Sequence, residues 1–263
     1  MRTFIGTGQG SPKDAVQRAT QGLSNPSAIL FMAPYEMAEE VAKLLYDTYP
    51  GVPSIGTIGT KIVNGQVSDK NLAVLGLFDD ARVSCGVIQR ISECPVAYAG
   101  EIQKKMNEVS PGQDDTACIE YCTGSEEKLV TTFTSCIGRK GIHLAGGTVF
   151  GVPEGRQPIV AYNGQVYEDA CVYAFIKNLT GKVRVYKENI YVNNSNKPHF
   201  ATKVDVSRKA LVELDGRPAA DVYSNELGVS RNQIVDNVLV NPMGRAVGDQ
   251  VFISSMMSLE PNG

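Results

Sequence analysis

The chain has 263 residues, enough for one large domain or two small ones at roughly 150 residues per domain. Hydrophobic residues make up 43% and charged residues 20%, values typical of folded globular proteins, which excludes disordered, collagen-like and coiled-coil classes. The net charge is −3 and the basic residues are scattered along the chain without forming a basic stripe, so nucleic acid is not an expected partner.

The sequence carries no membrane or metal-binding signal. Its apolar runs, such as Ala28 to Ala33, are far shorter than the ~20 residues of a membrane helix, and the N-terminus lacks the apolar region of a secretory signal. We therefore expect a cytoplasmic protein without a membrane segment. The six cysteines form no CxxC pair and no Cys/His cluster at zinc spacing, so we expect buried free thiols and no metal.

The first predicted elements are a helix, a buried strand and a second helix. Ser11-Pro12 is a typical N-cap followed by a proline at the first helical position, which predicts a helix to about Leu23. Residues 27–33 are continuously apolar and too short for a helix, so they predict a strand buried on both faces. Residues 35–49 carry apolar side chains at helical spacing.

Strands and tight turns follow the second helix. Residues 53–60 read PSIGTIGT, a glycine-rich strand, and Asn64-Gly65 is a hairpin signal. The apolar segment Leu72 to Val87 is interrupted by Asp79-Asp80, which predicts two strands joined by a turn. These elements together make a β-α-β-β-β unit.

The same order recurs further along the chain, which predicts a duplication. Aligning Ala28 with Ala117 and Thr57 with Thr148 places the two glycine-rich strands on equivalent positions at nearly the same phase. The elements predicted for the second copy are a strand at 116–124 (TACIEYCTG), a helix at 125–139, a glycine-rich strand at 143–151 (HLAGGTVFG), a turn at Asn163-Gly164, and strands at 169–178 and 182–191.

The duplication predicts an α/β fold with two homologous β-α-β-β-β repeats, over about 27–95 and 116–192, with central mixed sheets and outer helices. Ile29–Ala33 and Cys118–Cys122 should then occupy equivalent strands. The interface between the repeats is a natural place for a ligand pocket.

The pattern changes at about residue 197, which predicts a partial C-terminal α/β module over 206–263 after a first region over 1–205. The module should contain a helix at 217–228, a loop at 241–249 and a final strand at 251–259. Because the chain ends on Asn-Gly, we expect either that more protein follows or that the final strand pairs with an edge elsewhere.

Three segments follow one another along the chain: residues 27–60, HLAGGTVFG with the hairpin GQVYEDACVYAF, and PHFATKVDVSRKALVELDGRPAADVY. In this order they resemble the FIST sensory domains of bacterial signal-transduction proteins. The resemblance covers most of the chain from Ser27, as a FIST N-type region followed by the start of a FIST C-type module. Residues 241–256, NPMGRAVGDQVFISSM, are similar to the form of this module in cytoplasmic methyl-accepting chemotaxis receptors.

The resemblance implies a non-enzymatic input domain that binds a small metabolite, such as an amino acid, and signals to a downstream output domain or a histidine kinase pathway. A second copy of the chain, in a homodimer, is a further expected partner. One branch, the NosP-like proteins, is associated with haem and nitric oxide, so a haem-based sensor is the alternative function. His143 and His199 are the only imidazoles, and His143 is the better candidate axial ligand. We expect no haem.

The residues themselves suggest where a ligand binds. Glycines weaken strands unless a ligand or another backbone approaches closely, although two repeats packed strand against strand would explain them as well. An arginine in a turn can hold a ligand carboxylate, or can form a solvent-exposed salt bridge. A hydrolase or thiol enzyme is the third and least favoured hypothesis, because the sequence shows no convincing nucleophile with a base. The candidate ligand-binding residues are Thr57, Gly59, Thr60, Gly147, Thr148, Phe150, Arg217 and Arg245, with Thr57, Thr148 and one arginine facing a shared cavity.

Overall fold

The computed structural model describes residues 1–63, 65–186, 190–192, 198–206, 208–247, 250–254, 256 and 258–260. The chain forms two compact units, Met1–Lys187 and Glu188–Gly263. This division falls earlier in the chain than the expected boundary between residues 205 and 206. The expected boundary separates two family modules, and it stays a prediction. Among the described residues, none of the helices combines the length and the hydropathy that a bilayer crossing demands.

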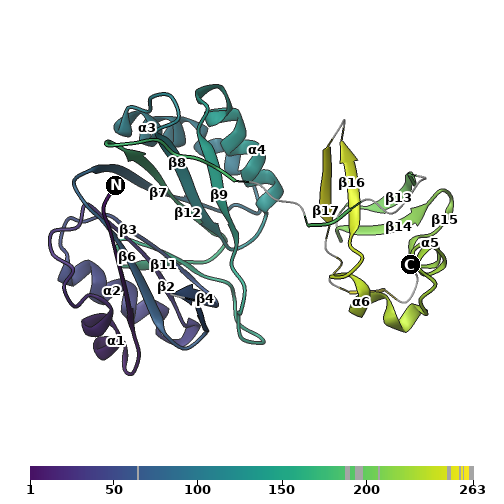
Figure 1. The fold of residues 1–263 in the computed structure, drawn as a ribbon, viewed down its shortest axis with the longest axis horizontal. Helices are drawn as coiled ribbons and strands as arrows, with labels where there is room; N and C mark the ends of the chain where they lie inside the picture. The colour runs from purple at the N-terminus through teal and green to yellow at the C-terminus, as the bar shows by residue number, and fades with distance from the viewer. Residues whose placement is uncertain are drawn as a thin grey trace. The chain divides into compact units, whose positions relative to one another are not determined.

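The first unit contains two sheets with helices packed against them (Figure 1). One core cluster includes residues of both sheets, such as Leu30 and Val172, and a second lies between the second sheet and the helices around Phe133. The first sheet has the order β1 (Thr3–Gly8), β6 (Leu72–Leu77), β2 (Ala28–Ala33), β3 (Ser54–Ile58), β10 (Val160–Tyr162) and β11 (Gln165–Tyr167). The second has the order β7 (Ala81–Gln89), β12 (Ala170–Asn178), β8 (Thr116–Cys122) and β9 (His143–Thr148). The helices are α1 (Pro12–Ala19), α2 (Ala38–Thr48), α3 (Ala99–Val109) and α4 (Glu126–Ile137), with short 3-10 turns η1 (Tyr35–Met37), η2 (Pro95–Tyr98) and η3 (Gly138–Lys140).

The sheet order confirms the predicted duplication. In the first sheet β2 pairs with β3 in parallel and with β6 antiparallel, and β6 pairs antiparallel with β1. In the second sheet β8 has the same relation to β9 and β12, and β12 to β7. Ile29–Ala33 in β2 and Cys118–Cys122 in β8 therefore occupy equivalent strands, as expected.

Each copy begins one strand and one helix earlier than the sequence indicated. The order β1, α1, β2, α2, β3, β6 corresponds to β7, α3, β8, α4, β9, β12. Strand β7, expected to close the first copy, instead opens the second, because the Asp79-Asp80 turn joins the two copies rather than two strands of one hairpin. The strand expected over 182–191 is absent from its described residues, 182–186 and 190–191.

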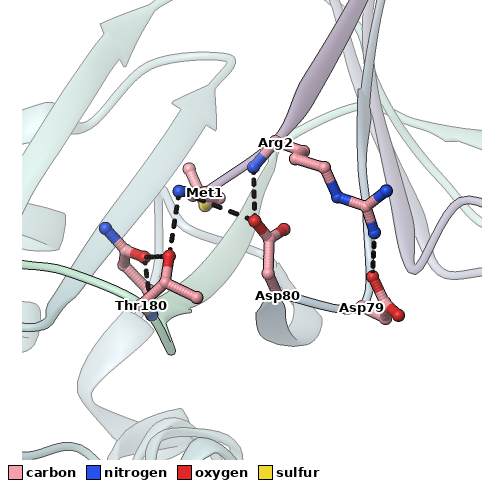
Figure 2. Close-up of polar contacts among 6 residues, drawn as sticks. Met1, Arg2, Asp79, Asp80 and Thr180 are labelled. Atoms are coloured by element: carbon pink, nitrogen blue, oxygen red, sulfur yellow. Dashed lines mark hydrogen bonds and ion pairs between the residues drawn. The ribbon is translucent and has the colours of Figure 1, made fainter.

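The turn between the copies also holds the start of β1 (Figure 2). The backbone amide of Arg2 donates a hydrogen bond to Oδ2 of Asp80 at 2.6 Å, and its guanidinium pairs with Asp79. The amino group of Met1 lies 3.6 Å from Oδ2 of Asp80 and donates to Oγ1 of Thr180, just beyond β12, at 3.1 Å. The first strand of one copy is thereby tied to the last strand of the other.

Each copy contains a hairpin, and the two hairpins are placed differently. Strands β10 and β11 belong to the second copy but pair with the first sheet, through Ala161 opposite Gly56 and Tyr162 opposite Ile55. The corresponding hairpin of the first copy, β4 (Lys61–Val63) and β5 (Gln66–Ser68), forms a separate two-stranded sheet. Asn64 of its predicted turn lies outside the described residues.

The second unit contains a sheet, a hairpin and two helices. Strand β17 pairs with β16, for example through Arg245 opposite Phe252. The expected loop over 241–249 therefore contains the return strand that the sequence analysis did not find, because its proline and glycines are typical of loops. The elements are β13 (Ala201–Asp205), β14 (Ala210–Leu214), β15 (Arg217–Pro218), α5 (Ala219–Leu227), η4 (Arg231–Gln233), α6 (Ile234–Asn237), β16 (Met243–Val247) and β17 (Gln250–Ser254).

Glycines in β1 allow α1 to pack directly on the sheet. A Cβ atom at Gly6 would collide with the carbonyl oxygen of Ala19, and one at Gly8 with that of Ala15. The N-terminal GTGQG sequence thus serves close packing between a helix and a strand.

Gly8→Ala should lower the free energy of unfolding by about 1 to 3 kcal/mol, because the added methyl group must displace the backbone of α1. The control is Gly100→Ala in α3, where no atom lies within 4 Å of the added Cβ. The control should raise stability by up to about 1 kcal/mol, since alanine favours helix. Urea denaturation measures both values, and equal changes in the two variants would contradict this explanation of the β1 glycines.

Candidate functional site

The glycine-rich strand of the first copy faces the protein core. The ring of Phe31, the residue opposite Gly56 on β2, occupies the space that a side chain at Gly56 would need. Thr57 points to the other face of β3, is 4% exposed, and donates its hydroxyl to the carbonyl oxygen of Ile58 at 3.3 Å. The glycine and threonine of this strand are therefore explained by close packing with neighbouring residues and not by an open cavity.

The glycine-rich strand of the second copy is an exposed edge. Thr148 lies opposite Cys122 on β8 and donates its hydroxyl to Oε2 of Glu126, at the start of α4, at 2.8 Å. Gly147 has no atom within 4 Å of the position of a Cβ.

The two threonines are not equivalent. With Ala28 aligned to Ala117, Cys122 corresponds to Ala33, whose partner on β3 is Ile58 and not Thr57. A shift of one residue along a strand reverses the face to which a side chain points. Thr57 and Thr148 therefore point to non-equivalent faces of their two sheets, and a cavity shared by both stays a prediction.

The two glycine-rich segments meet where they leave their strands. A Cβ at Gly59 would lie 3.3 Å from the carbonyl oxygen of Phe150, and one at Gly151 would lie 3.8 Å from Cα of Gly59. Gly59 has φ +128°, a conformation that favours glycine. Phe150 is 57% exposed, and Thr60 continues the chain toward β4. The interface between the copies thus brings Gly59 and Phe150 together. That they bind a ligand stays a prediction.

An open hollow of about 520 Å³ lies at the carboxyl ends of β1 and β2. In open α/β sheets this edge is where ligands bind. Three charged side chains line the hollow: Glu36 after β2, and Asp69 and Lys70 after β5. These residues were not among the predicted site residues, although Glu36 follows the predicted strand at 27–33, and Asp69 and Lys70 precede the predicted strand that starts at Leu72. The full lining is Gly10, Pro12, Pro34, Glu36, Met37, Asp69 and Lys70.

A buried carboxyl group lies among thiols on the helix-facing side of the second sheet. Glu120 is 3% exposed, and Sγ of Cys171 donates to its Oε2 at 3.5 Å. Burial raises the pKa of Glu120, and burial also raises the pKa of Cys85 and of Cys122, each to about 12. Such thiols stay protonated and are poor nucleophiles. The alternation of TACIEYC, with a glutamate between two buried cysteines on one face, was the signal that could have identified Glu120.

Because its folded-state pKa is raised, Glu120 keeps its proton at pH values where the unfolded chain has lost it. Its contribution to stability therefore falls as the pH rises from the ordinary value of 4.5 through the raised pKa. Glu120→Gln stays neutral, so its free energy of unfolding relative to the wild type should increase as the pH is raised above 4.5. Glu39→Gln is the control, because it makes the same substitution at an exposed position. Chemical denaturation across this range would contradict the burial argument if the two variants behaved alike.

The predicted arginines belong to the second unit. Arg217 is exposed in β15, and the guanidinium of Arg245 in β16 lies over the ring of Phe252, 5.9 Å from its centroid. That either arginine contacts a ligand stays a prediction.

The two histidines are the candidate axial ligands of the haem alternative, since haem iron is held by an axial side chain such as histidine. His143 is exposed at the start of edge strand β9. Nδ1 of His199 lies 2.7 Å from Oδ2 of Asp215, and its Nε2 lies 3.4 Å from Oε1 of Glu226. Among the residues that the structure describes, no group of three His, Cys, Asp or Glu side chains could hold a metal ion.

Comparison with known protein families gives one match. The sequence pattern of the FIST N domain matches residues 27–217, which spans most of both copies and the beginning of the second unit. A comparison with curated proteins found no match.

Proposed function

The chain belongs to the FIST N domain family, and from this premise we propose that it senses an amino acid through the hollow at the carboxyl ends of β1 and β2. FIST domains are sensory, small-ligand-binding domains of signalling proteins, and they are not known as enzymes. The observation that carries the proposal is the charge composition of the hollow.

Charges of both signs line the hollow. The ammonium of Lys70 suits a ligand carboxylate, while the carboxylates of Glu36 and Asp69 suit a ligand ammonium. A free amino acid carries both groups a few ångströms apart. A volume of about 520 Å³ also falls in the range of small-molecule sites.

The proposed context is a cytoplasmic chemoreceptor. The resemblance of residues 241–256 to the module of methyl-accepting chemotaxis proteins supports this context. The partner would then be a downstream output domain or a histidine kinase pathway, and a second copy of the chain in a homodimer is a further proposed partner. We propose no haem, because His143 is exposed and His199 contacts two carboxylates.

Isothermal calorimetry of the full chain against the standard amino acids tests the proposal. At least one should bind, and Lys70→Met or Glu36→Gln should weaken that binding on the order of 10- to 100-fold, because each removes a charge-assisted hydrogen bond of roughly 1.5 to 3 kcal/mol. Lys43→Met, an equal charge change on the exposed side of α2, should bind as the wild type does.

The absence of binding by every amino acid would overturn the ligand class. Binding that is equally strong in the wild type, Lys70→Met and Glu36→Gln would overturn the location.

A further inference from the structure

Strand β9 ends the second sheet with an unpaired outer edge. The sheet order stops at β9, and the described residues pair with it only through β8. The amide of Val149 donates to the carbonyl oxygen of Cys122, toward β8. Amides alternate in direction along a strand, so those of Leu144 and Gly146 point outward. Such an edge is a template for another strand.

The equivalent edge in the first sheet is covered. Strand β3 corresponds to β9, and the hairpin β10–β11 pairs with its outer side. The amide of Asn163 donates to the carbonyl oxygen of Ser54 at 3.0 Å, and the amide of Ser54 donates to Oδ1 of Asn163 at 2.9 Å. A hairpin from one copy thus completes the sheet of the other.

The hairpin of the first copy, β4–β5, is the counterpart of β10–β11 and leaves its apolar side chains in water. In the sequence, each pair of hairpin strands is separated by Asn-Gly, so Ile62 corresponds to Ala161. Ala161, docked on β3, is 3% exposed, whereas Ile62 is 73% exposed. Val67 on β5 is 67% exposed.

The hairpin begins beside the edge that lacks a partner. Gly59 contacts Phe150, two residues beyond the end of β9, and β4 starts two residues after Gly59. A strand that leaves this contact and runs back along β9 is antiparallel to it, as β10 is to β3. Little chain needs to move, because the two segments already meet at their ends.

We propose that the β4–β5 hairpin docks antiparallel on the outer edge of β9 and extends the second sheet to the six-strand order of the first. The register follows from the first sheet: Gly146 corresponds to Gly56, so Ile62 lies opposite Gly146 and Val63 opposite Ala145. Docking covers Ile62 and satisfies the outward amides of β9. Since Asp69 and Lys70 follow β5 directly, docking also repositions part of the lining of the hollow.

A disulfide reports the docked state. Tyr162 and Ile55 form a non-hydrogen-bonded pair, because the adjacent pair, Asn163 and Ser54, is hydrogen-bonded. The equivalent pair, Val63 and Ala145, therefore has the short Cβ separation that a disulfide requires. In the full chain with exposed Cys94→Ser, the double variant Val63→Cys/Ala145→Cys should form an intramolecular disulfide with oxidised glutathione, which is reduced to two glutathione thiols as the two cysteines lose their hydrogens.

The control combines Val63→Cys with Leu144→Cys. Leu144 packs on the helix-facing core, so its side chain lies on the opposite face of the sheet from that of Val63 in a docked hairpin. The expected result is at least a tenfold faster intramolecular disulfide in the Ala145→Cys variant, seen as a monomer of increased mobility without reductant. Equal rates in the two variants, or disulfides formed only between molecules, would overturn the proposal, the latter in favour of a second copy on this edge.

Hydrogen exchange tests the same state without added cysteines. Leu144 and Gly146 amides should exchange at least tenfold more slowly in the wild type than in Ile62→Pro, whose β4 cannot donate to β9. Identical exchange in the two proteins would overturn the docking.

Discussion

The pairing of Asn163 with Ser54 fixes the architecture of the first unit. Asn163 has φ +45°, so it turns the β10–β11 hairpin, and its main-chain and side-chain atoms both bond to the backbone of Ser54. This contact attaches a hairpin of the second copy to the sheet of the first. Because the ends of the two copies are also tied at Asp80, neither copy can separate without losing both connections.

The attachment of β10–β11 to the first sheet also explains which strand edge of the first unit is exposed. One sheet is complete and buries its edge, while the other ends at β9 and leaves Ile62 and Phe150 exposed. The hollow lies at the carboxyl ends of β1 and β2 in the first sheet, and two of its lining residues, Asp69 and Lys70, directly follow the β4–β5 hairpin. The proposed ligand site and the hairpin proposed to dock on β9 are thus neighbours in the chain.

Much of this fold was predictable from local patterns. Ser11 caps α1 as expected, accepting a hydrogen bond from the amide of Asp14, and the apolar run at 27–33 became the central strand β2. The duplication followed from the order of such elements. The boundaries of the copies did not follow, because a turn such as Asp79-Asp80 has the same composition whether it closes a hairpin or joins two repeats.

The candidate site was less predictable, because it depends on register and on tertiary contacts. In the sequence PSIGTIGT, nothing distinguishes the roles of Gly56 and Gly59. In the structure, Gly56 makes room for the ring of Phe31, and Gly59 makes room for the backbone of Phe150. Thr57 and Thr148 align in sequence, but strand register places them on opposite faces. The lining of the hollow comes from loops whose proximity only the sheet order establishes.

The central claim is that the two copies form one cooperative structure through the attachment of β10–β11 to β3. Hydrogen exchange of the full chain and of Asn163→Gly in increasing urea tests it most directly, since glycine keeps the positive φ and removes only the side-chain acceptor, worth about 1 kcal/mol. The account predicts that β2 and β8 lose protection at the same urea concentration and that the variant lowers both midpoints equally. Separate midpoints for β2 and β8, or a shift confined to one of them, would contradict it.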